Sequence, residues 1–236
     1  MAAGIASEKC NVFVYSIANF STFRCAEQIR NDVDYHKLPV TIVSVGSGVG
    51  YGNLGYTHHA LQDYALMRCF PNMQILSPGN NNELIALLNY IQKNPQPSYL
   101  RLDKTDHEEV EFKKISVSSG SIVKLIDGNK KRILLTTGSI QNLAKNIKLK
   151  KYKNHSLYSM PIWGMKAKNK VKNIIKKFDE IITIEDHFYD GGFGSWLKEC
   201  INDTNIKTKI KSKYIRPEVI NEVGSREYLL KKYGPK

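Results

Sequence analysis

The stretch that decides the fold is VTIVSVGSGVGYGNLGYTHH, residues 40–59. Its first six residues, VTIVSV, form a β-branched run that predicts a buried strand. Glycines then recur up to Gly55, and a glycine-rich backbone can approach a ligand closely. A strand that leads into such a loop indicates a ligand site at the carboxyl edge of a parallel sheet. We expect the loop to deliver His58 and His59 to that edge, at the start of a helix over residues 58–70.

Strand and helix patterns alternate on both sides of this stretch. Residues 20–33 predict a helix with Phe23 and Ala26 on one side. Further on, the turn signal Ser77-Pro78-Gly79 ends a strand, and Asn82 is expected to cap the next helix. The elements predicted for the first half are strands 12–15, 40–45, 74–76 and 99–102 and helices 20–33, 58–70 and 83–93.

A second alternating unit follows the charged segment DKTDHEEVEFKK, residues 103–114, which predicts a linker. Such alternation is typical of parallel sheets covered by helices. We therefore expect an α/β protein of two parallel-sheet domains, residues 1–115 and 116–236. The elements predicted for the second half are strands 122–126, 133–136, 156–160, 180–184 and 207–215 and helices 139–147, 166–178, 194–201 and 225–233.

Composition is that of an ordinary globular chain of 236 residues, of which 42 % are hydrophobic. Polar residues interrupt every apolar run and the N-terminus does not read as a signal peptide, so we expect a cytoplasmic protein without a membrane partner. The four cysteines are far apart and include no CxxC pair. We therefore expect neither a disulfide framework nor a metal site on this chain.

The formal net charge of +13 could accompany binding to nucleic acid, membranes or phosphorylated substrates. The lysines are scattered, however. In KAKNKVKNIIKKF, residues 166–178, they surround an apolar face that includes Val171 and Ile175, as on a solvated helix. We find neither aromatic residues interleaved with the basic ones nor a known nucleic-acid-binding module. No nucleic-acid partner is therefore expected.

Three further patterns could carry chemistry. Gly50, Gly52 and Gly55 satisfy GxGxxG, but the next strand ends in LSP and supplies no acid for a ribose, so dinucleotide binding is not favoured. In YSIANFSTFRCAEQIRND, residues 15–32, two phenylalanines three apart could form a stacking surface or pack in the core. In IEDHFYDGGFGSWLKE, residues 184–199, the acids and histidine could be acid–base groups or a turn and subunit contact, and Ser195 could cap a helix.

Taken in order, these segments resemble one family. The set comprises the aromatic-rich helix entry, the glycine loop ending in T-H, MRCFPNM (67–73), the S-P-x-x-x-x-E-L of residues 77–84, PSYLR (97–101) and IEDHFYDGGFGS (184–195). It is similar to the pyrimidine-binding and C-terminal domains of transketolases and of 1-deoxyxylulose-5-phosphate synthase. The greatest likeness is to the separate C-terminal subunit of split transketolases, and it extends over essentially the whole chain, through SREYLLKKYG (225–234).

The resemblance implies particular roles. The family uses thiamine diphosphate with Mg²⁺ to move a two-carbon unit from a ketose to an aldose. The aminopyrimidine of the cofactor would stack on Phe20 and Phe23, with Arg24 nearby. The T-H histidine, His58, would lie near the reacting atoms as the catalytic residue, and Arg101 would hold the substrate phosphate. The metal and diphosphate ligands would come from an N-terminal transketolase-type subunit, in an assembly that is expected to be a homodimer or a heterotetramer.

This chain also departs from the family pattern. The family's G-I-A-E-Q glutamate and its diphosphate domain are missing, so we expect an N-terminally truncated pyrimidine-binding domain that is inactive alone. Gly46 stands where full-length transketolases have a histidine, and Leu54 where they have an aspartate, which puts ordinary pentose-phosphate specificity in question.

The function expected from these patterns is that of a transketolase-type transferase subunit acting on sugar phosphates with a partner. Two alternatives stay open. The parent could be a 1-deoxyxylulose-5-phosphate synthase or the β subunit of a 2-oxoacid dehydrogenase. Alternatively, the chain could be a non-catalytic assembly or regulatory remnant, which the missing glutamate favours.

Overall fold

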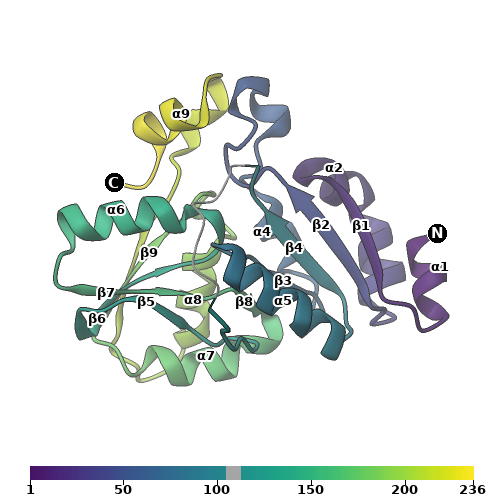
Figure 1. The fold of residues 1–236 in the computed structure, drawn as a ribbon, viewed down its shortest axis with the longest axis horizontal. Coiled ribbons are helices and arrows are strands. Elements are labelled where there is room, and N and C mark those ends of the chain that lie inside the picture. Colours follow the sequence, from purple (N-terminus) through teal and green to yellow (C-terminus); the bar gives the residue numbers. More distant parts are fainter. Residues whose placement is uncertain (105–112) are drawn as a thin grey trace.

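The computed structural model describes residues 1–104 and 113–236. In this part of the chain, two five-stranded sheets lie side by side and helices cover their faces (Figure 1). The α/β class predicted from the alternating patterns is confirmed. No helix within the described ranges is both long and apolar enough to cross a bilayer.

The first sheet has the strand order β1-β2-β4-β3-β8. Its first four strands run parallel, and β8 pairs antiparallel with β3. Because parallel strands end at one edge of the sheet, the segments after β1, β2 and β4 meet there. The strands are β1 (Val12–Ile17), β2 (Val40–Val45), β4 (Ser98–Leu102), β3 (Gln74–Leu76) and β8 (Ile162–Gly164).

The second sheet has the order β10-β9-β6-β7-β5. It is parallel except for β5, which pairs antiparallel with β7. Both sheets are therefore mostly parallel with one antiparallel edge strand, a detail that the expectation of purely parallel sheets missed. The strands are β10 (Lys209–Lys213), β9 (Glu180–Ile184), β6 (Asn129–Thr136), β7 (His155–Ser159) and β5 (Val123–Ile126).

Helices connect the strands and cover the sheets. Short 3₁₀ turns occur at Gly52–Leu54, Tyr56–His58 and Pro217–Asn221. The α-helices are α1 (Ala2–Ser7), α2 (Ala18–Thr22), α3 (Ala26–Gln28), α4 (Asp63–Met67), α5 (Asn81–Lys93), α6 (Gln141–Lys151), α7 (Lys168–Ile175), α8 (Phe193–Ile201) and α9 (Arg226–Tyr233).

Strand β8 was not predicted from the sequence, and it joins the two halves of the chain. It comes from the second half, yet Ile162 and Gly164 pair with Leu76 and Gln74 of the first sheet. Three residues are too few for a periodicity to show, so only the tertiary pairing defines this strand. The division near residue 115 stays a prediction, and most of the predicted linker, residues 105–112, lies outside the described residues.

One apolar core extends across both sheets. It includes Ile42 and Tyr99 from the first sheet and Ile133 and Ile181 from the second. Trp163 of β8 is fully buried between them, and its ring centroid lies 5.0 to 5.2 Å from those of Tyr64, Trp196 and Phe193. The two halves are thus packed against one another through large aromatic side chains, which dominate core energetics.

The helix predicted over residues 58–70 is much shorter than expected. Only α4 is α-helical, and His59 has an extended backbone at φ −70° and ψ 127°. Ala60 and Gly48 exchange two backbone hydrogen bonds, with N···O distances of 2.8 and 3.2 Å. This bridge holds the chain extended at the base of the glycine-rich loop, so the helix cannot begin before it.

The helix predicted over residues 20–33 is interrupted. It divides into α2, a 3₁₀ turn, α3 and a π-helical turn at Ile29–Asp34. The Thr22 hydroxyl donates to the Ala18 carbonyl four residues earlier, at 2.7 Å, and such back-bonding bends helices.

Two predicted caps are wrong. Asn80 rather than Asn82 caps α5, because its side chain accepts a hydrogen bond from the Glu83 amide at 3.0 Å. At α8, Gly192 is the N-cap residue, and the Ser195 hydroxyl instead donates to the Gly192 carbonyl at 2.8 Å. Local sequence located both helix starts to within a few residues, but α5 is capped by another asparagine and α8 follows a glycine and has no side-chain cap.

Candidate active site

The candidate site lies at the carboxyl edge of the first sheet, where three segments converge. Helix α2 follows β1, the glycine-rich loop 46–62 follows β2, and Asp103 and Lys104 follow β4. Ligands bind preferentially at this edge in parallel sheets. The glycine-rich loop was expected here from the sequence, and the structure places it here.

The loop folds back on itself around Tyr51. Gly46 has a positive φ of 91°, which favours glycine, and a Cβ at this position would lie 2.2 Å from the Tyr51 ring. The Tyr51 ring therefore occupies the space that a side chain at position 46 would need. This explains why glycine stands here and brings Tyr51 towards His58, with ring centroids 6.4 Å apart.

A series of contacts runs along the edge of the sheet, which we call the cation–aromatic row: Arg24, Phe20, His58, Tyr51 and Lys104. The Arg24 guanidinium carbon lies 5.1 Å from the centre of the Phe20 ring. The His58 ring meets Phe20 edge-on at 5.2 Å. The Lys104 ammonium lies 4.9 Å from the centre of the Tyr51 ring. A cation that lies over the face of an aromatic ring is attracted to it. Both cations of the row, Arg24 and Lys104, are exposed to solvent.

Asn19 fastens helix α2 to the loop that carries His58. Its side-chain amide donates to the carbonyls of His59 at 2.7 Å and Thr57 at 3.2 Å. Its Oδ1 atom is buried and has no hydrogen-bond partner in residues 1–104 or 113–236. The His58 ring is half-buried, and its Nδ1 lies 2.9 Å from the Thr57 hydroxyl. The position of His58 is thus fixed from both sides.

Three of the five residues predicted for the site come together. Phe20, Arg24 and His58 lie in the row, as just described. Phe23 is one turn further along, with 47 % of its surface exposed, and within the described chain no ring contact joins it to the row. The roles of these residues stay predictions, but the geometry makes Phe20, Arg24 and His58 neighbours.

Arg101 does not fit its predicted role. Its side chain is fully buried, and its guanidinium donates to Asp63 at 2.7 Å, to Asp186 at 2.7 Å and to the Ala60 carbonyl at 2.8 Å. Burial opposes its charge, but Asp186 and Asp63 outweigh burial and raise the pKa of Arg101 well above its usual range. A guanidinium held in this way cannot reach a substrate phosphate, so the sequence-based assignment is corrected here.

The exposed cation on this segment is Lys104, which sequence reasoning missed. Arg101 lies within β4, whereas Lys104 follows its carboxyl end, which is where ligand-binding side chains of parallel sheets occur. The position of Lys104 just after β4 could have identified it from the sequence. Lys104 instead falls within the charged segment, residues 103–114, that the sequence predicts to be a linker.

Beneath the row lies a group of buried charges, which we call the ion-pair cluster: Asp63, Arg101, Glu185, Asp186 and His187. His187 contacts Glu185 through Nε2 at 2.8 Å and Asp186 through Nδ1 at 3.2 Å. Burial alone would raise the pKa of Asp186, but Arg101 and His187 hold it well below its usual range. For His187, burial acts to lower the pKa, and hydrogen bonds to Asp186 and Glu185 outweigh it and raise the pKa.

The ion-pair cluster connects the two halves of the chain at the base of the loop. Asp186 follows β9 of the second sheet, and Arg101, from the first, holds both Asp186 and the Ala60 carbonyl. A second link joins the hydroxyls of Ser47 and Ser139 at 2.7 Å. Because the acids and histidine of the IEDH motif are buried, they serve within this chain as a bridge that supports the loop.

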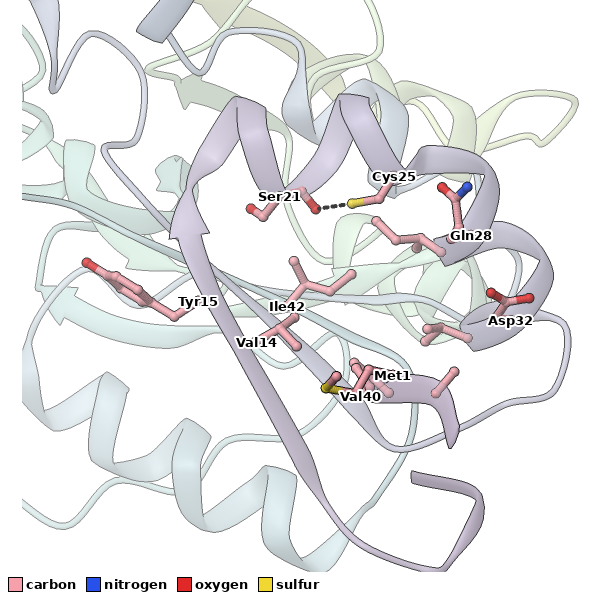
Figure 2. A pocket seen from close by; sticks show the side chains of 13 residues that line it. Met1, Val14, Tyr15, Ser21, Cys25, Gln28, Asp32, Val40 and Ile42 are labelled. Carbon is pink, nitrogen blue, oxygen red and sulfur yellow. Dashed lines mark hydrogen bonds between the residues drawn. The ribbon is translucent and has the colours of Figure 1, made fainter. Parts of the chain in front are cut away.

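An apolar groove of about 320 Å³ lies on the other side of helix α2. Figure 2 shows that Val14, Ile42 and Val40 face it from the first sheet. Gln28 and Asp32 stand on the helical turns at its rim. A lining this poor in polar groups has the character of a packing surface, so the chemistry is assigned to the cation–aromatic row.

Comparison with known proteins agrees with this architecture. Residues 1–108 match the family described as transketolase, pyrimidine binding domain. A protein of Methanocaldococcus jannaschii named as a transketolase C-terminal section is 30 % identical over 99 % of this chain and 74 % of its own length. One of the subunits of an apulose-4-phosphate transketolase from Actinobacillus succinogenes is 28 % identical, over 99 % of this chain and 76 % of its own length.

Two further matches bear on the fold and on the alternatives. The solved structure of a split-gene transketolase, described as an inactive beta4 tetramer, superposes with a TM-score of 0.79 at 24 % identity, covering 100 % of this chain and 75 % of that one. A 1-deoxy-D-xylulose-5-phosphate synthase of Halothermothrix orenii is 31 % identical over 81 % of this chain but only 31 % of its own length. From the ordered motifs, the two-sheet architecture and these matches together, the chain belongs to the transketolase family.

Proposed function

We propose that this chain is the C-terminal subunit of a two-part, thiamine-diphosphate-dependent transketolase of the cytoplasm, which moves a two-carbon ketol unit between sugar phosphates. The observation that carries the proposal is the cation–aromatic row at the carboxyl edge of the first sheet. It is supported by the match to 74 % and 76 % of the length of two proteins, one named as a transketolase C-terminal section and the other as a subunit of an apulose-4-phosphate transketolase.

The end of the row formed by Phe20 and Arg24 suits a flat, polar heterocycle such as the aminopyrimidine of thiamine diphosphate. The partly exposed Phe20 ring offers a stacking surface, and Phe23 offers a second ring on the next turn. The unpartnered Oδ1 of Asn19, in the described part of the chain, is an unused acceptor beside it. When bound, thiamine diphosphate supplies the nucleophilic carbon for ketose cleavage.

The remaining parts of the site divide between this chain and a partner. The residues of the row would orient the heterocycle and the sugar, whereas the diphosphate and Mg²⁺ would be held by an N-terminal transketolase-type subunit. The assembly would be a homodimer or, with the N-terminal subunit, a heterotetramer. In the described part of the chain, no group of three or more His, Cys, Asp or Glu side chains is placed to hold a metal ion.

His58 would handle protons on the substrate. Its Nδ1 lies 2.9 Å from the Thr57 hydroxyl, so Nε2 would be the ring nitrogen that meets a substrate hydroxyl. Histidine is the usual group for such transfers at neutral pH. Lys104 replaces Arg101 as the group that would attract the substrate phosphate, because it is exposed and lies beside Tyr51 at the same edge.

The test is cofactor binding by calorimetry with Mg²⁺, first for this chain alone and then for its mixture with a diphosphate-domain subunit from the same source. We expect binding in the mixture, followed by ketol transfer from a ketose phosphate to an aldose phosphate. A folded mixture that binds no thiamine diphosphate would contradict the proposal and support a non-catalytic assembly role.

Two variants locate the site. F20A should weaken the binding of thiamine diphosphate by about tenfold, because loss of a stacking ring costs about 0.5–1.5 kcal/mol in addition to the loss of buried apolar area. H58A should retain cofactor binding and lose about 100-fold to 10,000-fold in turnover. H36A is the matched control, since His36 is exposed on a surface turn away from the row. Equal losses in H58A and H36A would remove the basis for assigning His58.

The synthase alternative has one observation in its favour, the 31 % identity to the Halothermothrix orenii protein. The same mixture supplied with pyruvate and glyceraldehyde 3-phosphate, in place of a ketose donor, distinguishes the two reactions. Turnover with pyruvate alone as donor would replace the transketolase proposal with the synthase one.

A further inference from the structure

The last helix of the chain lies against the glycine-rich loop, although more than 160 residues separate them. Helix α9 appears beside that loop in Figure 1, and the Gly224 amide donates to the Gly52 carbonyl at 3.3 Å. A small apolar cluster joins the two segments: Val49 and Leu61 from the loop with Ile215, Val219, Leu229 and Tyr233. The C-terminal segment is therefore packed directly onto the element that carries Tyr51 and His58.

The glycine at position 52 permits this close approach. A Cβ there would lie 2.5 Å from the Gly224 carbonyl and 2.7 Å from a methyl group of Leu229. Both distances are too short for a contact, so a side chain at position 52 would overlap these groups unless the helix moved. The GxGxxG pattern of Gly50, Gly52 and Gly55 thus includes a glycine, Gly52, that the packing of the C-terminal helix requires.

An ion pair anchors the helix beside the cation–aromatic row. The Arg226 guanidinium, at the first residue of α9, lies 2.8 Å from Asp103 Oδ2, and the Asp103 side chain is fully buried. The other carboxylate oxygen of Asp103 accepts from the Lys104 amide at 2.7 Å. One carboxylate therefore connects the last helix to the backbone of the residue whose ammonium lies over Tyr51.

We propose that Arg226 is a positioning residue that latches α9 to Asp103 and so fixes Lys104 and Tyr51 for the phosphate end of the substrate. This rests on the proposed function for its catalytic consequence. Arg226 acts through Asp103 and is not expected to touch substrate. A partly buried, charge-assisted contact is strong enough to hold a turn in one arrangement, and a small misplacement of a substrate-holding group lowers catalytic efficiency.

The first arm of the test uses the full chain alone and measures hydrogen exchange of the amides in residues 46–59. R226M should speed exchange in this loop by about tenfold, whereas R226K should restore most of the protection. D103N should likewise speed exchange in this loop, because it weakens the carboxylate that the Arg226 guanidinium contacts at 2.8 Å. R216M is the matched control, since Arg216 contacts Lys232 and Tyr233 within the C-terminal segment. Unchanged exchange in R226M overturns the latch.

The second arm uses the reconstituted enzyme and compares a ketose phosphate with a ketose that lacks the phosphate. R226M should raise the KM for the phosphorylated ketose by about fivefold to tenfold with little change in kcat, and leave the KM for the other ketose unchanged. An equal rise for both ketoses overturns the assignment to the phosphate end. If the wild-type mixture is inactive, the proposed function fails, whereas the exchange arm still decides the latch by itself.

Discussion

The cation–aromatic row and the ion-pair cluster lie on either side of one loop and use similar residues in opposite ways. In the cluster, Arg101 and His187 are buried against carboxylates. In the row, Arg24 and Lys104 lie over aromatic rings and are exposed to solvent. The cluster satisfies its charges internally and holds the two sheets together, whereas the row keeps its charges available to a ligand.

The difference shows that residue type does not decide which charged group binds a substrate. Arg101 and Lys104 are three residues apart on one segment, and His58 and His59 are adjacent. In each pair one side chain is fully buried and the other is accessible. Burial makes an unpaired charge costly, so a buried cation is committed to its carboxylates before any ligand arrives.

The largest expected effect comes from breaking the ion-pair cluster. R101M would leave the carboxylates of Asp63 and Asp186 buried without the guanidinium that both contact. We expect the free energy of unfolding to fall by about 3–5 kcal/mol, as for other buried pairs that lose one partner. Urea unfolding followed by circular dichroism measures this. The control is K104M, which should change stability by less than about 0.5 kcal/mol because Lys104 is exposed. Similar losses in both variants would erase the distinction between cluster and row.

The same K104M variant should have its main effect on substrate binding. Loss of a charge-assisted contact to phosphate costs about 1.5–3 kcal/mol, which corresponds to a rise in KM of about tenfold to 100-fold. Steady-state kinetics with the reconstituted enzyme and a ketose phosphate measure it, and a ketose without phosphate is the control substrate. An unchanged KM for the phosphorylated substrate would assign the phosphate to another group.

His187 should make the contribution of the ion-pair cluster to stability depend on pH. Its folded-state pKa is raised, because hydrogen bonds to Asp186 and Glu185 outweigh burial. The stabilisation by protonated His187 is therefore complete below the unfolded pKa of about 6.5 and is lost as the pH rises through the folded pKa. The stability difference between wild type and H187Q should shrink as the pH rises above 6.5. A difference that stays constant up to pH 9 would contradict this.

His59, in the loop itself, should show a smaller effect of opposite sign. It is buried, and burial lowers its pKa below the usual value. Its protonation is therefore disfavoured in the folded state, so stability is lost as the pH falls below about 6.5 towards the folded pKa. Thermal unfolding of wild type and H59Q between pH 7 and pH 5 tests this. H59Q should lose less stability on acidification, and an equal loss in both would show that His59 does not titrate in this way.

Much of the fold was predictable because strand patterns are local. The predicted bounds of β2, β3 and β9 agree with the structure to the residue. Strands β2 and β9 are mostly β-branched runs, and β3 is a short segment that ends at the Ser77-Pro78-Gly79 turn signal. The helices were predicted less well. The segment after β1 bends at Thr22, and the one after the glycine loop is delayed by the Ala60–Gly48 bridge. Both departures arise from hydrogen bonds that periodicity does not encode.

By itself the sequence determined most of the strands and helices in their order, the class of the fold and the family, and it proposed Phe20, Arg24 and His58 as site residues. These follow from side-chain periodicity and from motifs in a fixed order, which are properties of neighbouring residues. Only the tertiary structure decided that β8 joins the first sheet, that Arg101 is internal while Lys104 is exposed, and that α9 packs on the glycine-rich loop. The physical reason is that burial and ion pairing depend on contacts between segments distant in sequence, and these exist only once both sheets have packed around one core.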